Sequence, residues 1–360
     1  MSAAADSVIA DRWRQLALAP PFALGGPLAR ALLKDSAADF EVRERLKFAA
    51  DGGKEHLLLE VRKTGRDTLS VARALARHAG VAAREVGFAG LKDRVAVTTQ
   101  WFSVPARLSR DAWAGVAGPG FEVLAVEPHS RKLRRGALAG NGFRIVLRDF
   151  HVAPEVLAAR LAAIELRGVP NYFGAQRFGR GGSNLEAIAR WCEGRALPVA
   201  REPRAFVYSA ARALVFNALL AARVLDGSWE RVLAGEFVNL DGRNSYFVAT
   251  EPDATLAARL LLHDIHPTGP LPGAGEHPGQ AVGALEAEIE ASFGGLTGLL
   301  AGAGLEAARR PLRVRPQNLK AVAAGALLTL EFDLPSGAYA TALVRELAAS
   351  APLELEVDDA

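Results

Sequence analysis

Apolar and polar residues alternate in several short stretches of the first half of the chain, which is the pattern of half-buried β-strands. Helical spacing over 70–78 interrupts this series, with Asp67 or Thr68 as a candidate N-terminal cap and Gly80 as a candidate stop. The residues before position 30 are rich in Ala and Leu and predict a partly ordered lead-in. The strand-like stretches are 39–46, 55–63, 95–104, 121–126 and 143–148.

From residue 153 to about 235 the apolar spacing becomes helical, and the longest predicted helix covers 206–225. Prolines and glycines over 267–283 predict a loop. Alternation returns over 326–334, and 337–349 has the spacing of a final helix. The chain thus has a strand-rich part, then a helix-rich part, then a further strand and helix. This order predicts an α/β fold of the α+β type, with a mixed sheet and an inserted domain.

The change of pattern along the chain also predicts the domain boundaries. A length of 360 residues allows about two domains. We expect an inserted, helix-rich domain over 168–313, which is a usual size for a domain. The remainder, 1–167 plus 314–360, is then one discontinuous domain.

Composition narrows the class of protein. Half of the residues are hydrophobic and the net charge is only +3, so we expect a folded globular protein, and total charge alone does not indicate a nucleic-acid partner. The single cysteine, Cys192, excludes an internal disulfide framework and a four-cysteine zinc site. We expect no membrane-spanning run and no signal peptide, and therefore a cytoplasmic protein without a membrane partner.

The segment 87–100 carries the most distinctive local chemistry. Gly87 and Gly90 predict a tight bend before the Lys-Asp-Arg triplet at 92–94, and a strand-like run follows. Such a bend would place one carboxylate between two cations at the start of a strand. Local physics alone leaves two interpretations open, a catalytic carboxylate or a solvated turn with a local ion pair.

Two groups of basic residues are candidates for contact with phosphates. Four cations occur in five positions outside any predicted element: Arg131, Lys132, Arg134 and Arg135. Such side chains neutralise phosphates, although a solvated run of charge has the same appearance. Arg177 and Arg180 flank glycines ahead of a helix that Ser183 could cap, and helix N-termini bind phosphates. No Gly-Lys-Ser/Thr follows, so a nucleotide-dependent enzyme is a poor alternative.

A metal site is not predicted. His263 and His266 are close in the sequence, but no third ligand accompanies them. The chain also lacks the Gly-x-Ser-x-Gly and His-Glu-x-x-His motifs. Aromatic residues do occur beside the polar segments, where some could stack on unpaired bases while most belong to the core.

Several blocks of the sequence resemble, in the same order, the motifs of the TruD family of tRNA pseudouridine synthases. The segment 88–94, followed by Gln100 and Trp101, is similar to the family's catalytic motif. The segments 131–143 and 168–179 are similar to the next two blocks of the family. Further matches are 209–212, 216–217, 271–273 and 339–347.

The resemblance implies a catalytic pseudouridine synthase domain interrupted by an inserted TRUD domain. Family members convert a uridine of tRNA, at position 13 in the bacterial enzymes, to pseudouridine, with neither a metal nor an organic cofactor. Asp93 matches the family's catalytic aspartate, which implies a nucleophile that neighbouring cations keep ionised. Lys34 and Lys92 are the candidate charge partners. The implied partner is tRNA, and we expect a monomer.

The same matching implies contacts with the substrate. Phe40 and Phe143 match aromatic residues that contact or stack on the substrate, and Asn141 matches a polar residue that reads or orients the base. Tyr339 stands where a familiar member has phenylalanine, which keeps the ring and adds a hydroxyl. Val95 stands where many relatives have histidine. The alternative function is a non-catalytic RNA-binding protein or tRNA chaperone that uses the same basic and aromatic residues.

Overall fold

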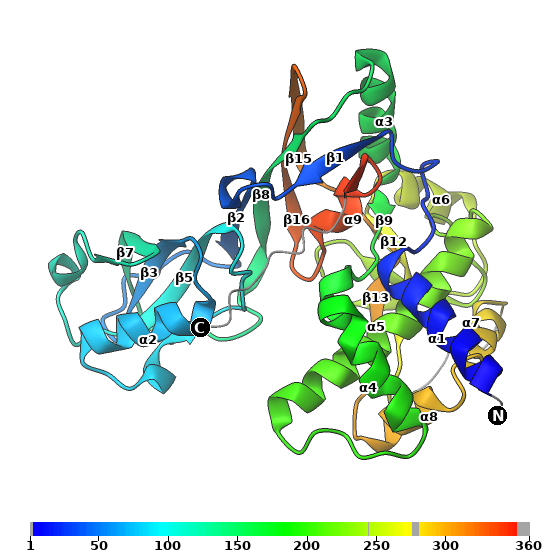
Figure 1. Ribbon diagram of the computed structural model, residues 1–360, viewed down its shortest axis with the longest axis horizontal. Helices are drawn as coiled ribbons and strands as arrows, with labels where there is room; N and C mark the ends of the chain where they lie inside the picture. The colour runs from blue at the N-terminus through cyan, green and yellow to red at the C-terminus, as the bar shows by residue number, and fades with distance from the viewer. Residues whose placement is uncertain (1–2, 244, 276–280, 351–360) are drawn as a thin grey trace. The chain divides into compact units, whose positions relative to one another are not determined.

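The computed structural model describes residues 3–243, 245–275 and 281–350 (Figure 1). Contacts between residues divide the chain into two compact units, which we name the sheet unit and the helical unit after their main secondary structure. The sheet unit comprises Leu28–Ala153, Pro316–Gly337 and Ala348–Ala360. The helical unit comprises Met1–Pro27, Pro154–Arg315 and Ala338–Leu347.

The sheet unit is organised around one large mixed sheet. Its strands are β1 (Ala29–Leu33), β2 (Phe40–Leu46), β3 (His56–Lys63), β4 (Gly87–Phe88), β5 (Val97–Pro105), β6 (Ala117–Gly118), β7 (Phe121–His129), β8 (Leu138–Arg148), β15 (Gln317–Ala324), β16 (Leu327–Pro335) and β17 (Ala348–Ser350). The order is β15-β16-β8-β2-β5-β3-β7-β6, while β1 pairs with β8 and β17, and β4 pairs with β5. The β2–β5 and β1–β17 pairs are parallel and β8 is antiparallel to both of its neighbours β2 and β16, so the predicted mixed sheet is confirmed.

Helix α2 (Thr68–Ala79) covers part of this sheet and confirms the predicted caps. The Asp67 side chain accepts a hydrogen bond from the backbone N–H of Ser70, and Gly80 ends the helix at a φ of 65°. The helix packs Leu75 against Leu59 of the sheet, and both side chains are fully buried. Burying a leucine side chain contributes about 1.5–3 kcal/mol to stability, so this layer fixes the position of the strands beneath it.

The register gives the sheet two chemically different faces. On β8, Phe143 lies opposite Phe332 of β16, whereas the next residue, Arg144, lies opposite Glu41 and Glu331. Successive residues of a strand point to opposite faces. We therefore call the face of Phe143 and Phe332 the aromatic face, and the face of Arg144, Glu41 and Glu331 the charged face.

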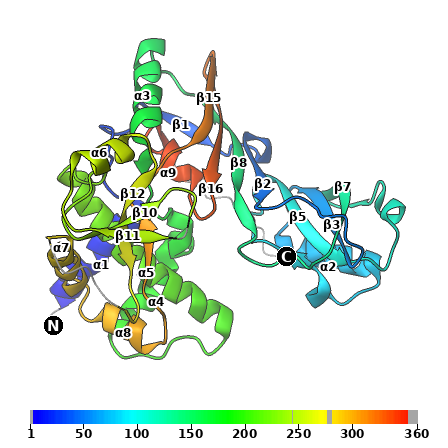
Figure 2. The same cartoon turned by 180° about the vertical axis from the view of Figure 1, so that it is seen from behind.

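The helical unit combines helices with a smaller sheet. Its helices are α1 (Ala3–Leu18), α3 (Pro154–Arg167), α4 (Ser183–Cys192), α5 (Arg201–Leu225), α6 (Ala254–Leu261), α7 (Ala281–Ala291), α8 (Leu296–Gly302) and α9 (Ala340–Val344). Its strands are β9 (Val169–Pro170), β10 (Glu236–Leu240), β11 (Tyr246–Ala249), β12 (Ile265–Leu271), β13 (Ala308–Pro311) and β14 (Arg313–Val314). The order β11-β10-β12-β13 forms a four-stranded sheet, of which Figure 2 labels β10, β11 and β12, and β9 pairs with β14.

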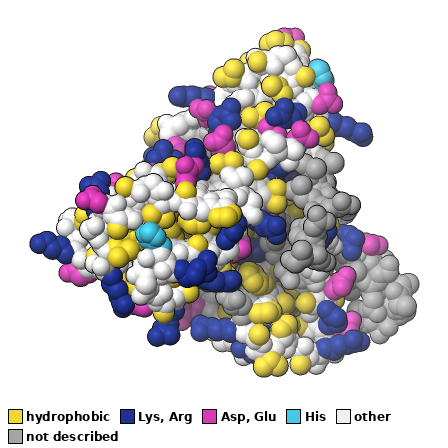
Figure 3. All heavy atoms as spheres, turned by 60° about the vertical axis from the view of Figure 1, so that its left-hand side comes forward, with side chains coloured by type: hydrophobic (Ala, Val, Ile, Leu, Met, Phe, Trp, Pro, Cys, Tyr) yellow, Lys and Arg dark blue, Asp and Glu magenta, His cyan; other side chains and the backbone are white. Residues whose placement is uncertain are grey.

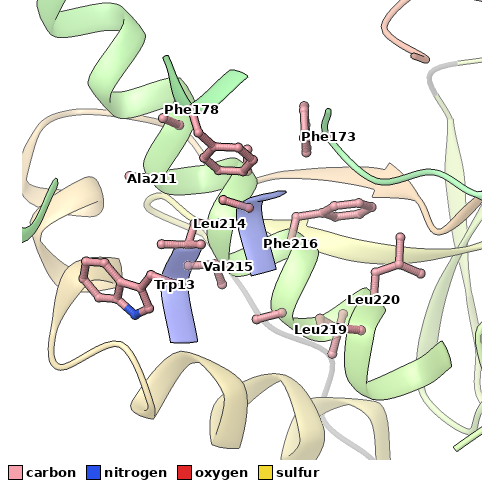
Figure 4. Close-up of a cluster of buried hydrophobic side chains, with 14 of the residues drawn as sticks. Trp13, Phe173, Phe178, Ala211, Leu214, Val215, Phe216, Leu219 and Leu220 are labelled. Atoms are coloured by element: carbon pink, nitrogen blue, oxygen red, sulfur yellow. The ribbon is translucent and has the colours of Figure 1, made fainter. Parts of the chain in front are cut away.

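Helix α5 forms the centre of the helical unit. Its residues Leu214, Phe216 and Leu219 are fully buried, and Trp13 of α1 and Phe173 join the same cluster (Figure 4). The segment Pro203–Leu225 is long and apolar enough, by length and composition, to cross a membrane, so the expectation that no run reaches this length is wrong. Because 67% of the apolar window is buried inside the protein, α5 acts as a core helix in this structure.

Four local predictions are corrected by the structure. The residues 3–18 form helix α1, because Trp13 is buried in the core. The predicted loop at 267–283 begins as strand β12, which keeps its pairing with β10 and β13 although two of its residues are prolines, and it ends in helix α7. Residues 276–280 of this prediction lie outside the described residues. The predicted helix over 337–349 is reduced to α9, followed by β17. Ser183 is the first residue of α4, and Gly182 occupies the cap position.

The compact units have other bounds than the predicted domains. The lead-in up to Pro27, the segment 154–167 and the segment 338–347 all belong to the helical unit, whereas we had expected them in the discontinuous domain. Helix α1 explains the first difference, since it packs against α4 and α5. The boundaries 167/168 and 313/314 stay a prediction about the domains of the family.

Candidate active site

Asp93 lies in the loop between β4 and β5 of the sheet unit. Its Oδ2 accepts a hydrogen bond from Lys34 Nζ at 2.8 Å, and its Oδ1 accepts one from the backbone N–H of Val95 at 3.2 Å. The Asp93 side chain is 30% exposed and the Lys34 side chain 17%, so the pair is sheltered but reachable. An ammonium and a peptide N–H both stabilise the ionised carboxylate, which is the form that can act as a nucleophile.

A buried lysine fixes the backbone of this loop. Lys63, at the end of β3, is 1% exposed and donates to the carbonyl oxygens of Asp93 at 2.8 Å and Arg66 at 2.9 Å. Burial lowers the pKa of Lys63 to about 8, and the charges of Asp93 and Asp67 oppose that shift. The ammonium is therefore still mainly charged at neutral pH. The sequence interpretation missed this residue.

Side chains from α2 and β5 hold the residues just before Asp93. The Gln100 side chain donates to the Gly90 carbonyl at 2.7 Å and accepts from the Thr68 hydroxyl at 3.0 Å. The same hydroxyl accepts from the backbone N–H of Lys92 at 3.0 Å. Both Thr68 and Gln100 are buried. The loop is thus bound to two regular elements, which limits the movement of the carboxylate.

The glycines of this segment serve packing rather than backbone freedom. A Cβ on Gly87 would lie 2.4 Å from the Leu133 carbonyl oxygen, so β4 requires glycine for close approach of another part of the chain. A Cβ on Gly90 would meet only ordinary contacts. Neither glycine has a positive φ. The predicted bend is present at Ala89 and Gly90, but it needs no left-handed backbone, and the side-chain network described above orients the loop.

Aromatic rings adjoin the ion pair on the aromatic face. Lys34 Nζ lies 4.3 Å from the centroid of the Phe40 ring, and Phe40 contacts Phe143 edge-on at 6.2 Å. Phe143 in turn stacks on Phe332 at 5.4 Å. Phe40 is buried and Phe143 is half-buried. The structure thus brings together the predicted residues Asp93, Lys34, Phe40 and Phe143.

The second predicted charge partner, Lys92, has other partners. Its Nζ donates to Asn141 Oδ1 at 2.6 Å and forms an ion pair with Glu44 Oε1 at 3.1 Å. Glu44 was not among the predicted site residues, although the alternation of 40–46 places it on the same face as Phe40. Burial raises the pKa of Glu44, and the Lys92 charge opposes that shift. Lys34 is therefore the ion-pair partner of Asp93, and Lys92 is that of Glu44.

The predicted phosphate contacts lie on the surface. Arg131, Lys132, Arg134 and Arg135 are all exposed in the loop between β7 and β8. Figure 3 shows one face of the molecule, on which Lys and Arg side chains are interspersed with Asp and Glu. The loop is anchored by Leu133, which is buried and whose N–H donates to the Ser103 hydroxyl at 2.8 Å. This arrangement leaves Arg131, Arg134 and Arg135 in water, where they can reach a polyanion, whereas Lys132 Nζ donates to the Arg84 carbonyl oxygen.

A groove of about 980 Å³ is lined by residues of both faces of the sheet, Phe143 and Phe332 among them, and does not include Asp93. Its lining includes four acidic and four basic side chains. Arg144 pairs there with Glu41 at 3.1 Å, and Arg62 pairs with Glu122 at 2.5 Å. Because the charges compensate one another, the groove has no excess of positive charge for a phosphate backbone. We therefore place the candidate active site on the aromatic face, by its chemistry.

The helical unit holds Tyr339, Arg177 and Arg180. The Tyr339 hydroxyl accepts from Arg177 Nε at 2.9 Å and Nη2 at 2.6 Å, and Arg177 Nη1 donates to the Ser209 hydroxyl. Tyr339 also contacts Phe173 edge-on at 5.9 Å. Arg180 is exposed. The hydroxyl that distinguishes tyrosine from phenylalanine thus fixes a guanidinium, which leaves Arg177 fewer free donors for a phosphate.

Tyr339→Phe is expected to lower the free energy of unfolding by about 1 kcal/mol, because the half-buried Arg177 loses the acceptor of two hydrogen bonds. Urea denaturation of the variant beside the wild type measures the effect. Tyr246→Phe, at an exposed tyrosine on β11, is the matched control and should leave the stability unchanged. Equal stabilities for all three proteins would show that the Arg177–Tyr339 contact contributes nothing.

The two histidines considered for a metal are engaged in other contacts. His266 Nε2 lies 2.9 Å from Asp241 Oδ1, and His263 Nε2 lies 2.8 Å from the Leu166 carbonyl oxygen. Burial lowers the pKa of His263 to about 4, so its imidazole is neutral. Among the residues that the structure describes, no group of three or more His, Cys, Asp or Glu side chains could hold a metal ion.

Lys34→Met is expected to reduce any activity that depends on ionised Asp93 by about 10- to 100-fold at neutral pH. The carboxylate then loses the ammonium at 2.8 Å, which holds it in place and stabilises its negative charge. Lys34→Arg retains a cation and should lose less. Single-turnover rates of the three proteins at neutral pH test this prediction, and a Lys34→Met rate equal to that of the wild type would refute it.

Comparison with known proteins identifies the relatives of the chain. Residues 22–192 and 196–347 match the family model of tRNA pseudouridine synthase D (TruD). A tRNA pseudouridine synthase D of Nitrosococcus oceani is 46% identical over 332 residues, which cover 90% of this chain and 93% of the relative. That of Pseudomonas entomophila is 43% identical over 337 residues, covering 92% and 95%.

A solved structure shows the same fold. The Methanosarcina mazei protein solved under the name tRNA pseudouridine synthase D (TruD) aligns with a TM-score of 0.69, covers 92% of this chain and 96% of its own, and is 22% identical. The likeness supports the α/β class that the sequence predicts. Together with the family model and the curated relatives, it leads to one conclusion: the chain belongs to the TruD family of tRNA pseudouridine synthases.

Proposed function

We propose that this protein converts a uridine of tRNA, at position 13, to pseudouridine, with Asp93 as the nucleophile. The observation that carries the proposal is the Asp93–Lys34 ion pair at 2.8 Å beside the Phe40 and Phe143 rings, in a chain that matches the TruD family over almost its whole length. A carboxylate that is held ionised and is partly exposed, next to aromatic rings, is what chemistry on an unstacked base requires.

The reaction is an isomerisation. The bond between N1 and C1′ breaks, the uracil turns, and a bond between C5 and C1′ forms, after which C5 releases its proton and N1 gains one. Substrate and product have the same atoms and the same oxidation state, so the chemistry needs neither an oxidant nor a reductant. We therefore propose that the protein works without a cofactor. Asp93 would attack the nucleotide at C1′ or at C6, or would assist removal of the C2′ proton, and Lys34 would keep the carboxylate ionised.

The remaining residues have roles in binding. Phe143 is half-buried and offers a ring on which the uracil can stack, while Phe40 supports that ring from its edge. Asn141 offers a carboxamide two positions before Phe143, on the same face. The exposed cations of the β7–β8 loop and Arg180 would contact the phosphate backbone, which predicts binding that weakens as salt increases.

Incubation with unmodified tRNA tests the proposal. The tRNA carries uridines labelled with tritium at C5, because formation of the C5–C1′ bond releases that hydrogen to water. Chemical mapping of pseudouridine then locates the product. We expect one equivalent of tritium per tRNA and a product at position 13. Binding of tRNA without any release would favour the alternative, a non-catalytic RNA-binding protein. The cytoplasmic location and the monomeric state stay predictions.

A further inference from the structure

A buried carboxylate next to the active-site loop has no role in the reaction described so far. The Glu44 side chain, on β2, is 0% exposed. Its Oε2 accepts a hydrogen bond from the backbone N–H of Trp101 at 3.0 Å, and its Oε1 lies 3.1 Å from Lys92 Nζ. A buried charge is costly unless it is paired, so the Lys92 ammonium is held by Glu44 in one place.

The position of that ammonium determines how Asn141 is oriented. Lys92 Nζ lies 2.6 Å from the Asn141 side chain, and an ammonium can only donate hydrogen bonds. The atom that faces Lys92 is therefore the carbonyl oxygen of the carboxamide, and the NH2 group must point elsewhere. Among the contacts of the described residues, the NH2 group of Asn141 donates no hydrogen bond, and the residue is half-exposed.

The register places this NH2 group beside the aromatic rings. Asn141 lies opposite Glu44 on the neighbouring strand, and Phe143 follows two positions later on the same face. A base stacked on Phe143 would therefore have a hydrogen-bond donor near its edge. Uracil offers two carbonyl oxygens as acceptors, O2 and O4, whereas cytosine has an amino group in place of O4.

We propose that Glu44 is a positioning residue that acts through Lys92 to present the NH2 group of Asn141 to a carbonyl oxygen of the target uracil. The inference rests on the proposed function, and a contact with O4 would add a reason for the choice of base, because cytosine shares only the O2 carbonyl with uracil. Glu44 and Lys92 touch no substrate atom in this role. Without Glu44, the ammonium is no longer fixed and the carboxamide can turn its oxygen toward the base, where two acceptors would repel each other.

The test combines protein variants with single-atom changes in the substrate. Single-turnover rates and tRNA dissociation constants are measured for the wild type, Glu44→Gln and Asn141→Ala. The tRNAs carry uridine, 2-thiouridine or 4-thiouridine at the target position, because sulfur is a weaker acceptor than oxygen. Glu41→Gln is the matched control, since Glu41 lies on the same strand and points to the charged face. Thermal unfolding shows which variants are folded.

We expect Glu44→Gln to slow the single-turnover rate by about 10- to 100-fold while the dissociation constant changes by less than about threefold, because the variant loses alignment rather than binding. For each protein, the rate on a thio-tRNA is compared with its rate on the uridine tRNA. In the wild type, one of the two thio-tRNAs should react about fivefold to tenfold more slowly than the uridine tRNA. In Asn141→Ala and Glu44→Gln, the same thio-tRNA should react less than about twofold more slowly. Glu41→Gln should keep the wild-type rate and the wild-type thio effect.

The outcomes separate this inference from the function on which it rests. If the wild type forms no pseudouridine on uridine tRNA, the proposed function fails. If the wild type is active but its thio effect is absent, or is the same in Asn141→Ala, the inference is overturned while the function stands. A Glu44→Gln rate equal to that of the wild type also overturns it. If Glu44→Gln does not fold, the Asn141→Ala comparison still decides whether the carboxamide recognises a carbonyl oxygen.

Discussion

Asp93→Asn is expected to lower the rate of pseudouridine formation by more than about 10³-fold while tRNA binding is retained. Asparagine has nearly the same size and keeps one of the two side-chain acceptors, toward either Lys34 or the Val95 N–H. The backbone carbonyl of residue 93 still accepts from Lys63, so the loop keeps this anchor. What the variant loses is the negative charge and the nucleophilic oxygen. Tritium release under single-turnover conditions measures the rate, and filter binding measures the affinity for tRNA.

Asp35→Asn is the matched control for this prediction. Asp35 is an exposed carboxylate directly after Lys34, and its contact with Arg148 is long, at 3.7 Å. Its replacement should change the rate by less than about twofold, since exposed ion pairs contribute little. An Asp93→Asn protein as active as Asp35→Asn would remove Asp93 from the mechanism.

Arg223→Met is expected to lower the free energy of unfolding by about 3–5 kcal/mol. Arg223 and Glu236 are completely buried in the helical unit and form an ion pair at 2.8 Å, and Arg223 also donates to Ser228 and to the Arg231 carbonyl. Removal of the guanidinium leaves a buried carboxyl without this cation and takes one donor from each of the Ser228 and Arg231 carbonyl oxygens, of which the Ser228 oxygen keeps the Arg231 N–H. Guanidinium chloride denaturation at neutral pH measures the loss.

Two further variants show whether the loss has this cause. Arg201→Met changes an exposed arginine of the same helix, α5, and should alter the stability by less than about 0.5 kcal/mol. The double variant Arg223→Met/Glu236→Met removes both charges and should be more stable than Arg223→Met alone. If Arg223→Met is as stable as Arg201→Met, the buried pair does not stabilise the unit.

Much of the sheet unit is predictable from local sequence, because its strands alternate and its main helix has both caps. The stretches 39–46 and 55–63 correspond to β2 and β3, and Asp67 and Gly80 delimit α2 as expected. The helical unit is less predictable. Strand β12 contains two prolines, which favour a loop locally, and only its two neighbouring strands make it a strand.

The active site follows the same division between local pattern and tertiary contact. Resemblance to the family indicates Asp93, Lys34, Phe40, Asn141 and Phe143, and the structure brings these residues together in the sheet unit. The resemblance could not indicate that Lys92 pairs with Glu44 of β2, because that contact depends on the tertiary arrangement of the strands.

The buried contacts that fix functional side chains cannot be predicted from local sequence. Lys63 shares a face of its strand with Leu59 and Val61, so alternation places it toward the core, whereas a lysine is a residue type expected at the surface. Only the fold shows that it is 1% exposed and binds the Asp93 carbonyl. Tyr339 is a similar case, since its substitution for phenylalanine is explained by Arg177, which is 162 positions away in the sequence.

The central claim, that this chain makes pseudouridine in tRNA through Asp93, is tested most directly in cells that lack the protein. Chemical mapping of pseudouridine is applied to tRNA from the parent strain, the deletion strain, and deletion strains that express either the wild-type chain or Asp93→Asn. We predict that pseudouridine at position 13 disappears in the deletion strain, returns with the wild-type chain and stays absent with Asp93→Asn. Pseudouridine that persists in the deletion strain, or that returns with Asp93→Asn, would contradict the claim.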